Sequence, residues 1–343
     1  MIYWVQLEIF VRPDLPLNIA DAELADELTQ SMKLVEERLF AAVETDNDLL
    51  AASARHLISA GGKRLRPFLV FLGAQFGAHR DERILSAAAS MELTHIGTLY
   101  HDDVMDEATI RRGVPSAHVL WGTKVAVLTG DFLYARASQL LAELGDEAIR
   151  LHARTFIRLC EGQSAETAGP QSEADRLNHY LGVLANKTAS LFAASGELGG
   201  LLSGAPGEIV ARIGRACEAW GIAYQLSDDV LDITSGTDQS GKPPGADLRE
   251  GVPTLPMIYA SRSSLATDAR LVELMRSGQL TDPALHAEAL KLLQEHPAVD
   301  MTRAEVRKWA GIARQEITNL PDSPARDVLE MLCDFVVDRT KSG

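Results

Sequence analysis

Two aspartate clusters of identical spacing constrain this chain more than any other feature of its sequence. Residues 102–106 read Asp-Asp-Val-Met-Asp, and residues 228–232 read Asp-Asp-Val-Leu-Asp. In a helix, the first and last acids of such a cluster lie one turn apart on the same face. Each cluster follows a run of mostly apolar or small residues, so we expect both at the ends of buried helices. Two such faces opposed across a cavity would gather up to six carboxylates, which a folded protein tolerates only if cations neutralise them.

Hard divalent cations with oxygen ligands meet this requirement. Mg²⁺ typically takes one or two carboxylates and fills its remaining positions with water and substrate phosphates. The alternating acids and terminal glutamate of an EF-hand loop are missing, which excludes a calcium site of that type. A single cluster of this kind can also be a solvated helix end, but its repetition after two apolar runs favours a site for a diphosphate substrate.

The composition narrows the class of protein. The chain has 343 residues and a formal net charge of -15, so it lacks the broad basic surface that a general nucleic-acid partner requires. Its three cysteines are scattered and form no C-x-x-C pair, which favours reduced thiols in a cytoplasmic protein over a disulfide framework or a zinc site. No apolar stretch reaches the length of a membrane span. Residues 1–11 are apolar but lack the basic start and cleavage site of a signal peptide, and residues 1–18 are a candidate N-terminal arm.

Helical periodicity runs through nearly the whole chain. Apolar residues recur at three- and four-residue spacing over residues 20–43, 48–60, 67–77, 83–107, 123–144, 147–161, 172–202 and 206–234. Strand-like alternation is scarce, and glycine and proline gather at the joints. We therefore predict a single all-α domain over residues 1–343, with about ten to thirteen helices.

Basic residues occur where the recognition of a diphosphate would need them. Lys63, Arg64 and Arg66 follow a glycine pair, and arginine binds phosphate in a bidentate way. Arg111 and Arg112 follow the first acid cluster. Either group alone could be an exposed basic turn, but the alternation of cations and acid clusters along an acidic chain is more specific.

Four polar residues later in the chain fit the same kind of site. Lys187 and Thr188 lie in the middle of a predicted helix, where the lysine either extends along apolar surface to water or faces a phosphate-bearing cavity. Gln225 lies about one turn before the second cluster. Lys242 follows that cluster in a glycine-rich segment of the kind that forms a lid.

The chain resembles the trans-isoprenyl diphosphate synthases, also called polyprenyl synthetases, in a set of motifs that occur in the family's order. These motifs are GGKRLRP, HDDVMDEATIRRG, NKTASLF, YQLSDDVLD and GKPPGADLREG followed by TLP. The resemblance implies an all-α helical bundle of the isoprenoid synthase type around a central cavity, acting as a homodimer in the cytoplasm. It also implies that isopentenyl diphosphate and an allylic diphosphate are condensed with up to about three Mg²⁺ ions bound to the diphosphate. Release of the product would involve transient membrane contact.

The resemblance assigns a role to each motif residue. The implied metal ligands are Asp102, Asp103, Asp106, Asp228, Asp229 and Asp232. The allylic diphosphate would be contacted by Arg111, Lys187 and Lys242, and isopentenyl diphosphate by Lys63, Arg66, His95 and Arg112. Thr188 and Gln225 would line the reaction centre. The residues expected to act directly in catalysis are Asp102, Asp106, Arg111, Lys187, Thr188, Gln225, Asp228 and Lys242.

One position departs from the family pattern, and other activities compete with the main prediction. Many members carry G-K-x-T-L-P late in the lid, whereas Val252 stands in place of that lysine here. The alternatives are a short-chain farnesyl or geranylgeranyl diphosphate synthase, a non-catalytic regulatory subunit of a heteromeric synthase, and a terpene cyclase. The intact acid clusters oppose the regulatory subunit, and the basic residues of the implied isopentenyl site oppose the cyclase.

The helix that carries Asp102 also bears on product length. One helical turn rises about 5.4 Å, close to the length of an extended isoprene unit, so a helix face can act as a ruler. Short-chain relatives commonly place an aromatic residue four or five positions before the first acid, and here those positions are Thr98 and Gly97, with Thr94 one turn further. The absence of an aromatic plug predicts a medium- or long-chain product of about C30–C50. The alternative is that small residues here only permit close helix packing.

Overall fold

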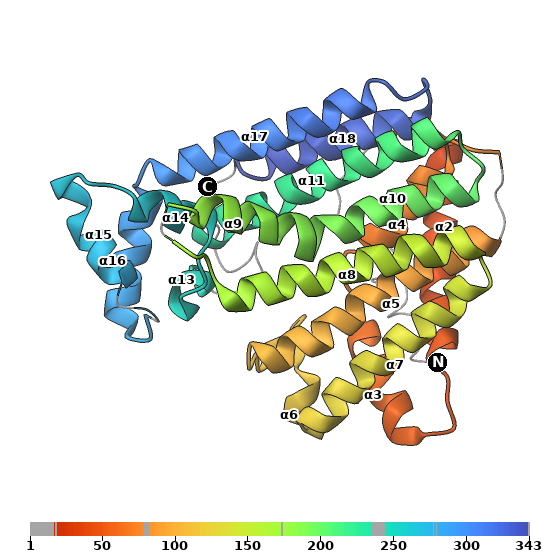
Figure 1. Cartoon of the computed structure of the whole chain (residues 1–343), viewed down its shortest axis with the longest axis horizontal. Helices are drawn as coiled ribbons and strands as arrows, with labels where there is room; N and C mark the ends of the chain where they lie inside the picture. Colours follow the sequence, from red (N-terminus) through yellow and green to blue (C-terminus); the bar gives the residue numbers. More distant parts are fainter. Residues whose placement is uncertain are drawn as a thin grey trace. The chain divides into compact units, whose positions relative to one another are not determined.

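The structure, a computed structural model, describes residues 17–341 apart from 18, 79–81, 173, 235–243, 277 and 279. Helices account for nearly all regular structure within these residues, which confirms the predicted all-α class (Figure 1). The chain divides into two compact units. Unit 1 comprises Met1–Phe156, Leu191–Cys217 and Ile317–Leu329, and unit 2 comprises Ile157–Ser190, Glu218–Glu316 and Glu330–Gly343. A single domain over the whole chain stays a prediction, and of the predicted arm only residue 17 is described.

Unit 1 is built around one long helix. Its helices are α2 (Ala22–Ala42), α3 (Asp48–Ser59), α4 (Leu65–Ala74), α5 (Glu82–Met105), α6 (Ala117–Trp121) and α7 (Thr123–Ala142). Helix α5 contacts α2, α4 and α7, and Figure 1 shows α5 and α7 side by side. Leu93, Ile96 and Tyr100 of α5 are fully buried because this helix is apolar on several faces. The end of α5 carries the first acid cluster, so the core of unit 1 positions these acids.

Glycines allow two helices of unit 1 to approach closely. A Cβ atom built at Gly199 of α10 (Ser190–Leu202) would lie 2.0 Å from the carbonyl oxygen of Val70 in α4. A Cβ atom at Gly73 would lie 2.3 Å from the carbonyl oxygen of Gly196. Any side chain at either position would push the helices apart. This packing holds α4, whose first two residues end the basic turn of residues 61–66.

A short hairpin follows the first acid cluster and is missing from the sequence-based prediction. Strand β1 (Ile110–Arg111) pairs antiparallel with β2 (Val114–Pro115), with Arg111 opposite Val114. The two loop residues, Arg112 and Gly113, have φ of 52° and 76°. Positive φ at both positions is typical of the tight turns that join hairpin strands. The hairpin therefore turns the two consecutive arginines in different directions.

Unit 2 has its own apolar core. Its complete helices are α9 (Arg176–Val183), the π-helix η1 (Leu184–Ala189), α13 (Ala246–Glu250), α14 (Leu255–Ser261), the 3-10 helix η2 (Ala266–Asp268), α15 (Ala269–Arg276) and α16 (Pro283–Gln294). Buried residues of α13 to α16 pack on Val230 and Ile233, which belong to the last turns of α11 (Gly207–Thr234). The second acid cluster lies on these turns, so its backbone is anchored by the core of unit 2.

The remaining helices contribute residues to both units. They are α8 (Asp146–Ala168), α10, α11 (Gly207–Thr234), α17 (Ala298–Ile317) and α18 (Pro324–Asp338). Helix α8 extends seven residues beyond the predicted end at residue 161. The predicted helix over 172–202 is instead a succession of α9, η1 and α10. Among the helices described, none combines the length and the apolar composition that crossing a membrane requires.

Candidate active site

The first acid cluster presents its members in two directions. Asp102 is half-buried and Asp106 is exposed, as expected for acids one turn apart at the end of α5. Asp103 is only 1% exposed, and its Oδ1 accepts a hydrogen bond from Nε of Arg111 at 2.7 Å. Burial raises the pKa of Asp103, and the Arg111 guanidinium opposes that rise. Asp103 therefore anchors the hairpin to α5, whereas the outer two acids remain accessible.

The basic turn of residues 61–66 separates its three cations. Lys63 is exposed, Arg64 is buried and Arg66 is half-buried. The Cζ atom of Arg66 lies 4.5 Å from the centre of the Phe192 ring, a cation–π distance. Arg64 has a φ of 48°, a left-handed conformation that is uncommon for a residue with a side chain. The turn thus offers two cations near its surface and directs one into the core.

The hairpin brings Arg112 onto this turn. Arg112 donates through Nη1 to the carbonyl oxygen of Gly61, and a Cβ atom at Gly62 would lie 2.8 Å from its Cζ. The second glycine of the motif therefore makes room for the guanidinium. Burial and nearby positive charges, those of Arg66 and Arg112 foremost, hold the pKa of His95 well below 6.5. His95 is consequently neutral near pH 7 and would act as a hydrogen-bonding group.

In the second acid cluster, Asp228 forms an ion pair with Arg339, the residue that follows α18. Arg339 donates through Nη2 to Oδ1 of Asp228 at 2.6 Å and through Nη1 to Oγ of Ser227 at 3.1 Å. Its guanidinium also lies 4.7 Å from the centre of the Tyr224 ring. A metal at this oxygen of Asp228 would therefore compete with Arg339.

Asp229 and Asp232 connect α11 to later segments. Asp229 is 3% exposed, and its Oδ2 accepts hydrogen bonds from the Tyr180 hydroxyl and, at 3.0 Å, from the backbone N–H of Leu255. Burial raises the pKa of Asp229 to about 8, although both hydrogen bonds oppose the rise. Asp232 accepts from the backbone N–H groups of Ala246 at 3.1 Å and Asp247 at 3.3 Å, at the start of α13. The cluster thus anchors the segment of residues 246–255 to α11.

Lys187 and Thr188 lie in the π-helix η1, and both are half-buried. Nζ of Lys187 donates to Oε2 of Glu166 in α8, so the lysine is held by an acid of unit 2. Single-turn π segments inside helices occur frequently at functional sites. A Cβ atom at Gly162 would lie 2.5 Å from the backbone nitrogen of Lys187, so this glycine allows the wide turn to pack against α8. Gln225 is half-buried on α11. Lys242 lies outside the described residues.

The residues on the predicted ruler face of α5 differ in their burial and in the space around their side chains. Thr98 is half-buried, and its hydroxyl donates to the carbonyl oxygen of His95 at 2.7 Å. Gly97 is buried, with Cε1 of Tyr134 3.2 Å from the position of an added Cβ atom. Thr94 is fully buried, and its hydroxyl lies 2.9 Å from Nε2 of His152 in α8. Thr98 can therefore accept a larger side chain more readily than Gly97.

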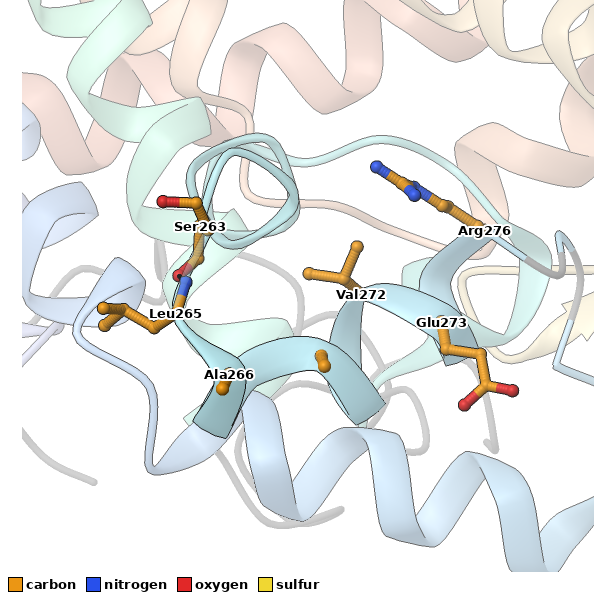
Figure 2. A pocket seen from close by; sticks show the side chains of 8 residues that line it. Ser263, Leu265, Ala266, Val272, Glu273 and Arg276 are labelled. Carbon is orange, nitrogen blue, oxygen red and sulfur yellow. Dashed lines mark hydrogen bonds between the residues drawn. The ribbon is translucent and has the colours of Figure 1, made fainter.

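A pocket of about 430 Å³ lies elsewhere in unit 2 (Figure 2). Its lining includes Ser263, Leu265, Glu273 and Arg276, from the segment after α14 and from α15. None of its lining residues belongs to the acid clusters or to the basic motifs. This pocket is therefore separate from the residues that carry the predicted chemistry.

The structure brings the predicted residues together in two groups, one in each unit. In unit 1 the basic turn, His95 and Arg112 are neighbours, and Asp103 joins the hairpin to α5. In unit 2 Asp229 and Tyr180 form one hydrogen-bonded pair, whose surroundings include Glu166 and Asp247. Sequence reasoning did not predict that Arg64 is buried or that Glu36 and Glu92 are its partners. It also did not predict the contacts made by Tyr180, Glu166 and Arg339. An acid at position 92 inside an otherwise apolar run was the one local signal for such a partner.

Comparison with known proteins identifies the family of this chain. A model of the polyprenyl synthetase family matches residues 47–325. The nonaprenyl diphosphate synthase of Mycobacterium tuberculosis is 44% identical over 324 residues, which are 94% of this chain and 96% of that protein. The dimethylallyltranstransferase of the same organism is 39% identical over 317 residues, 92% of this chain and 95% of that protein.

Solved structures of similar proteins share the fold. Geranylgeranyl pyrophosphate synthase from Corynebacterium glutamicum, complexed with calcium and isoprenyl diphosphate, has a TM-score of 0.85 and 38% identity, covering 94% of this chain and 99% of that one. Decaprenyl diphosphate synthase from Rhodobacter capsulatus has a TM-score of 0.84 and 35% identity, covering 93% and 98%. The chain therefore belongs to the polyprenyl synthetase family. It is a transferase of prenyl groups, and the resemblance predicted from its motifs is confirmed.

We predict that His152 makes the protein sensitive to acid. Burial lowers the pKa of His152 from 6.5 to about 4, so the folded protein binds this proton more weakly than the unfolded chain. The resulting stability is complete above about pH 6.5 and is lost as the pH falls toward 4, by about 3 kcal/mol at pH 4. His152→Gln keeps a partner for Thr94 but does not titrate. Urea unfolding from pH 7 to pH 4 should show a smaller loss for the variant, and parallel curves would contradict the prediction.

Proposed function

We propose that this prenyltransferase condenses isopentenyl diphosphate with an allylic diphosphate and repeats the reaction to give an all-trans product of about C30–C50, as the α5 ruler implies. The nonaprenyl and decaprenyl diphosphate synthases among its relatives support a medium or long product. Relatives named as geranylgeranyl pyrophosphate synthase and dimethylallyltranstransferase keep a short-chain product as the second candidate.

The observation that carries this proposal is the gathering of basic residues in unit 1. The basic turn, His95 and Arg112 are neighbours, and Arg111 reaches Asp103 at the end of α5, the helix that carries Asp102 and Asp106. Such a group of cations matches a diphosphate, because arginine donors pair with phosphate oxygens. A terpene cyclase has no second diphosphate substrate to recognise, so this basic group favours chain elongation.

The acid clusters fit Mg²⁺ that is bound together with substrate. Within the described residues, no group of three or more acidic, histidine or cysteine side chains is arranged to hold an ion unaided. Mg²⁺ needs only one or two carboxylates when phosphates and water complete its coordination. We assign Asp102 and Asp106 to this role in unit 1 and Asp228 in unit 2. Asp103 and Asp229 are buried and bound to protein groups, so we assign them to anchoring.

The proposed reaction needs charge stabilisation more than a side-chain base. When bound, the metal ions would neutralise the leaving diphosphate as the allylic C–O bond breaks. In unit 1, Arg111 would add positive charge to this group. In unit 2, Lys187 is held by Glu166 and would have to leave it to bind a phosphate. Lys63 and Arg66 would hold isopentenyl diphosphate so that its double bond attacks the allylic cation. The departed diphosphate would accept the proton that is then lost.

A homodimer and a cytoplasmic location complete the proposal. Helices α6 and α7 expose Val119, Leu120, Val127 and Leu128, with Leu128 62% exposed. Clustered exposed apolar side chains on one part of a surface often mark a protein contact, and the occupant we propose is a second copy of this chain. The free cysteines Cys160, Cys217 and Cys333 fit a reducing compartment. A long apolar product would leave through transient membrane contact.

The activity and its metal ligands can be tested in one assay. Purified protein, Mg²⁺, farnesyl diphosphate and labelled isopentenyl diphosphate should give products longer than the primer. Asp102→Asn or Asp106→Asn should lower kcat by roughly two orders of magnitude or more, because charge stabilisation of the leaving group is lost. Glu107→Gln, next to the cluster, should retain activity. Calorimetry should show weaker Mg²⁺ binding to the two aspartate variants in the presence of diphosphate, and wild-type-like binding would remove them from the metal site.

Product length should respond to Thr98. Thr98→Phe places an aromatic plug on the ruler face and should shorten the product to about C15–C20 while the first condensation persists. Thr29→Phe is a matched control, since Thr29 is exposed on α2 and its hydroxyl likewise donates to a backbone carbonyl. Chromatographic sizing of the products measures the change. An unmodified enzyme that stops at about C20 with excess isopentenyl diphosphate would instead support the short-chain candidate.

The proposed dimer should depend on the exposed face of α7. Leu128→Glu places a charge in the contact and should shift the protein from dimer to monomer, measured by sedimentation velocity. Leu265→Glu is a suitable control, because Leu265 is exposed to a similar degree, 66%, but lies in unit 2. A monomeric wild-type protein at micromolar concentration would refute the homodimer.

A further inference from the structure

Every donor of the Arg64 guanidinium is used within unit 1. Nε and Nη2 donate to the two carboxylate oxygens of Glu36 at 2.5 and 3.1 Å. Nη1 donates to Oε1 of Glu92 at 2.9 Å and to the carbonyl oxygen of Gly61 at 3.2 Å. Nη2 also donates to the carbonyl oxygen of Ile58 at 3.0 Å. Since a guanidinium has five N–H donors, this side chain has no capacity left for a substrate.

These contacts explain the unusual backbone of the basic turn. Arg64 is 3% exposed and has a φ of 48°. A left-handed conformation at a residue with a side chain persists only where surrounding contacts impose it. Here the contacts reach α2 through Glu36, α5 through Glu92 and the end of α3 through Ile58. The turn that carries Lys63 and Arg66 is therefore fixed by the buried residue between them.

Arg64 is also coupled to Arg112 through shared acceptors. Arg112 donates through Nη1 to the carbonyl oxygens of Leu57, at 2.8 Å, and of Gly61, which Arg64 also uses. Nη2 of Arg112 lies 3.7 Å from Oε1 of Glu92, the oxygen bound by Arg64. Glu92 is 1% exposed. If Arg64 were absent, the nearest cation for this buried carboxylate would be Arg112.

We propose that Arg64 is a positioning residue for the isopentenyl diphosphate half of the site. It holds the turn that presents Lys63 and Arg66, and it binds Oε1 of Glu92, which limits the pull of this carboxylate on Arg112. This inference rests on the function proposed above. Lysine cannot replace Arg64 in this role, because it offers three donors on a flexible stem and lacks the planar fork that matches Glu36.

The test separates the two substrates kinetically. Arg64→Met should raise the KM for isopentenyl diphosphate on the order of tenfold or more, the effect of losing a charge-assisted phosphate contact. The KM for the allylic diphosphate should change by no more than about twofold, because the metal-binding acids are untouched. Adding Glu92→Gln to Arg64→Met removes the carboxylate that draws Arg112 inward. The double variant should therefore recover part of the lost affinity for isopentenyl diphosphate, although it lacks one more native polar contact.

Three further variants define the comparison. Arg38→Met removes a half-buried arginine from α2, where Arg38 donates to Ser86, and should leave both KM values unchanged. Lys63→Ala removes a proposed direct contact and should reproduce the selective rise in KM, with no recovery on adding Glu92→Gln. Arg64→Lys should behave like Arg64→Met.

Each outcome bears on the proposal. Equal effects of Arg64→Met on both substrates, or no recovery in the double variant, would reduce Arg64 to a general structural role and overturn the inference. If circular dichroism shows that Arg64→Met does not fold, Glu36→Gln takes its place. That substitution loosens Arg64 but leaves the positive charge of Arg64 in the protein. An unchanged KM for isopentenyl diphosphate in folded Glu36→Gln would equally overturn the inference. A wild-type enzyme that elongates no primer would refute the proposed function instead.

Discussion

A carboxylate removed from water has to be neutralised, and this requirement organises the candidate site. Among the described residues, the buried acids are Glu36, Glu92 and Asp103 in unit 1 and Asp229 in unit 2, and each contacts a residue of the predicted motifs. Arg64 donates to the first two, Arg112 lies 3.7 Å from the second, and Arg111 pairs with the third. Asp229 has its pKa raised to about 8 and accepts hydrogen bonds from Tyr180 and Leu255. Each partner comes from another segment, so the neutralisation of one acid also positions a loop or a helix end.

The repeated D-D-x-x-D spacing therefore serves two purposes. In both clusters the second aspartate is the buried one, and it ties its helix to a segment that follows in the chain. Backbone strain gathers nearby, because the described non-glycine residues with positive φ are Arg64, Glu107 and Arg112. Contacts that hold such conformations also limit motion of the attached cations. A rigid set of cations suits a reaction whose catalysis is chiefly charge stabilisation.

The features predictable from the sequence were those that depend on neighbours along the chain. Helical periodicity placed α5 at 83–107 against the observed Glu82–Met105, and the acid and basic motifs identified the family. The burial of Arg64 was not predictable from its position between two accessible cations, since its partners Glu36 and Glu92 are each 28 residues away. The pairing of Asp228 with Arg339 joins residues 111 positions apart. The π-helix around Lys187 keeps the apolar spacing of an ordinary helix closely enough that periodicity did not reveal it.

Arg339 gives the second acid cluster a counter-ion that belongs to the chain itself. Because this guanidinium is tethered, its local concentration near Asp228 does not fall when the protein is diluted. The apparent affinity of the proposed metal at Asp228 therefore includes the free energy of undocking Arg339. Ion binding and docking of the segment that follows α18 are linked equilibria, and the linkage is reciprocal. Whatever loosens that segment would strengthen ion binding at Asp228, and an ion bound there would weaken the docking of the segment in turn.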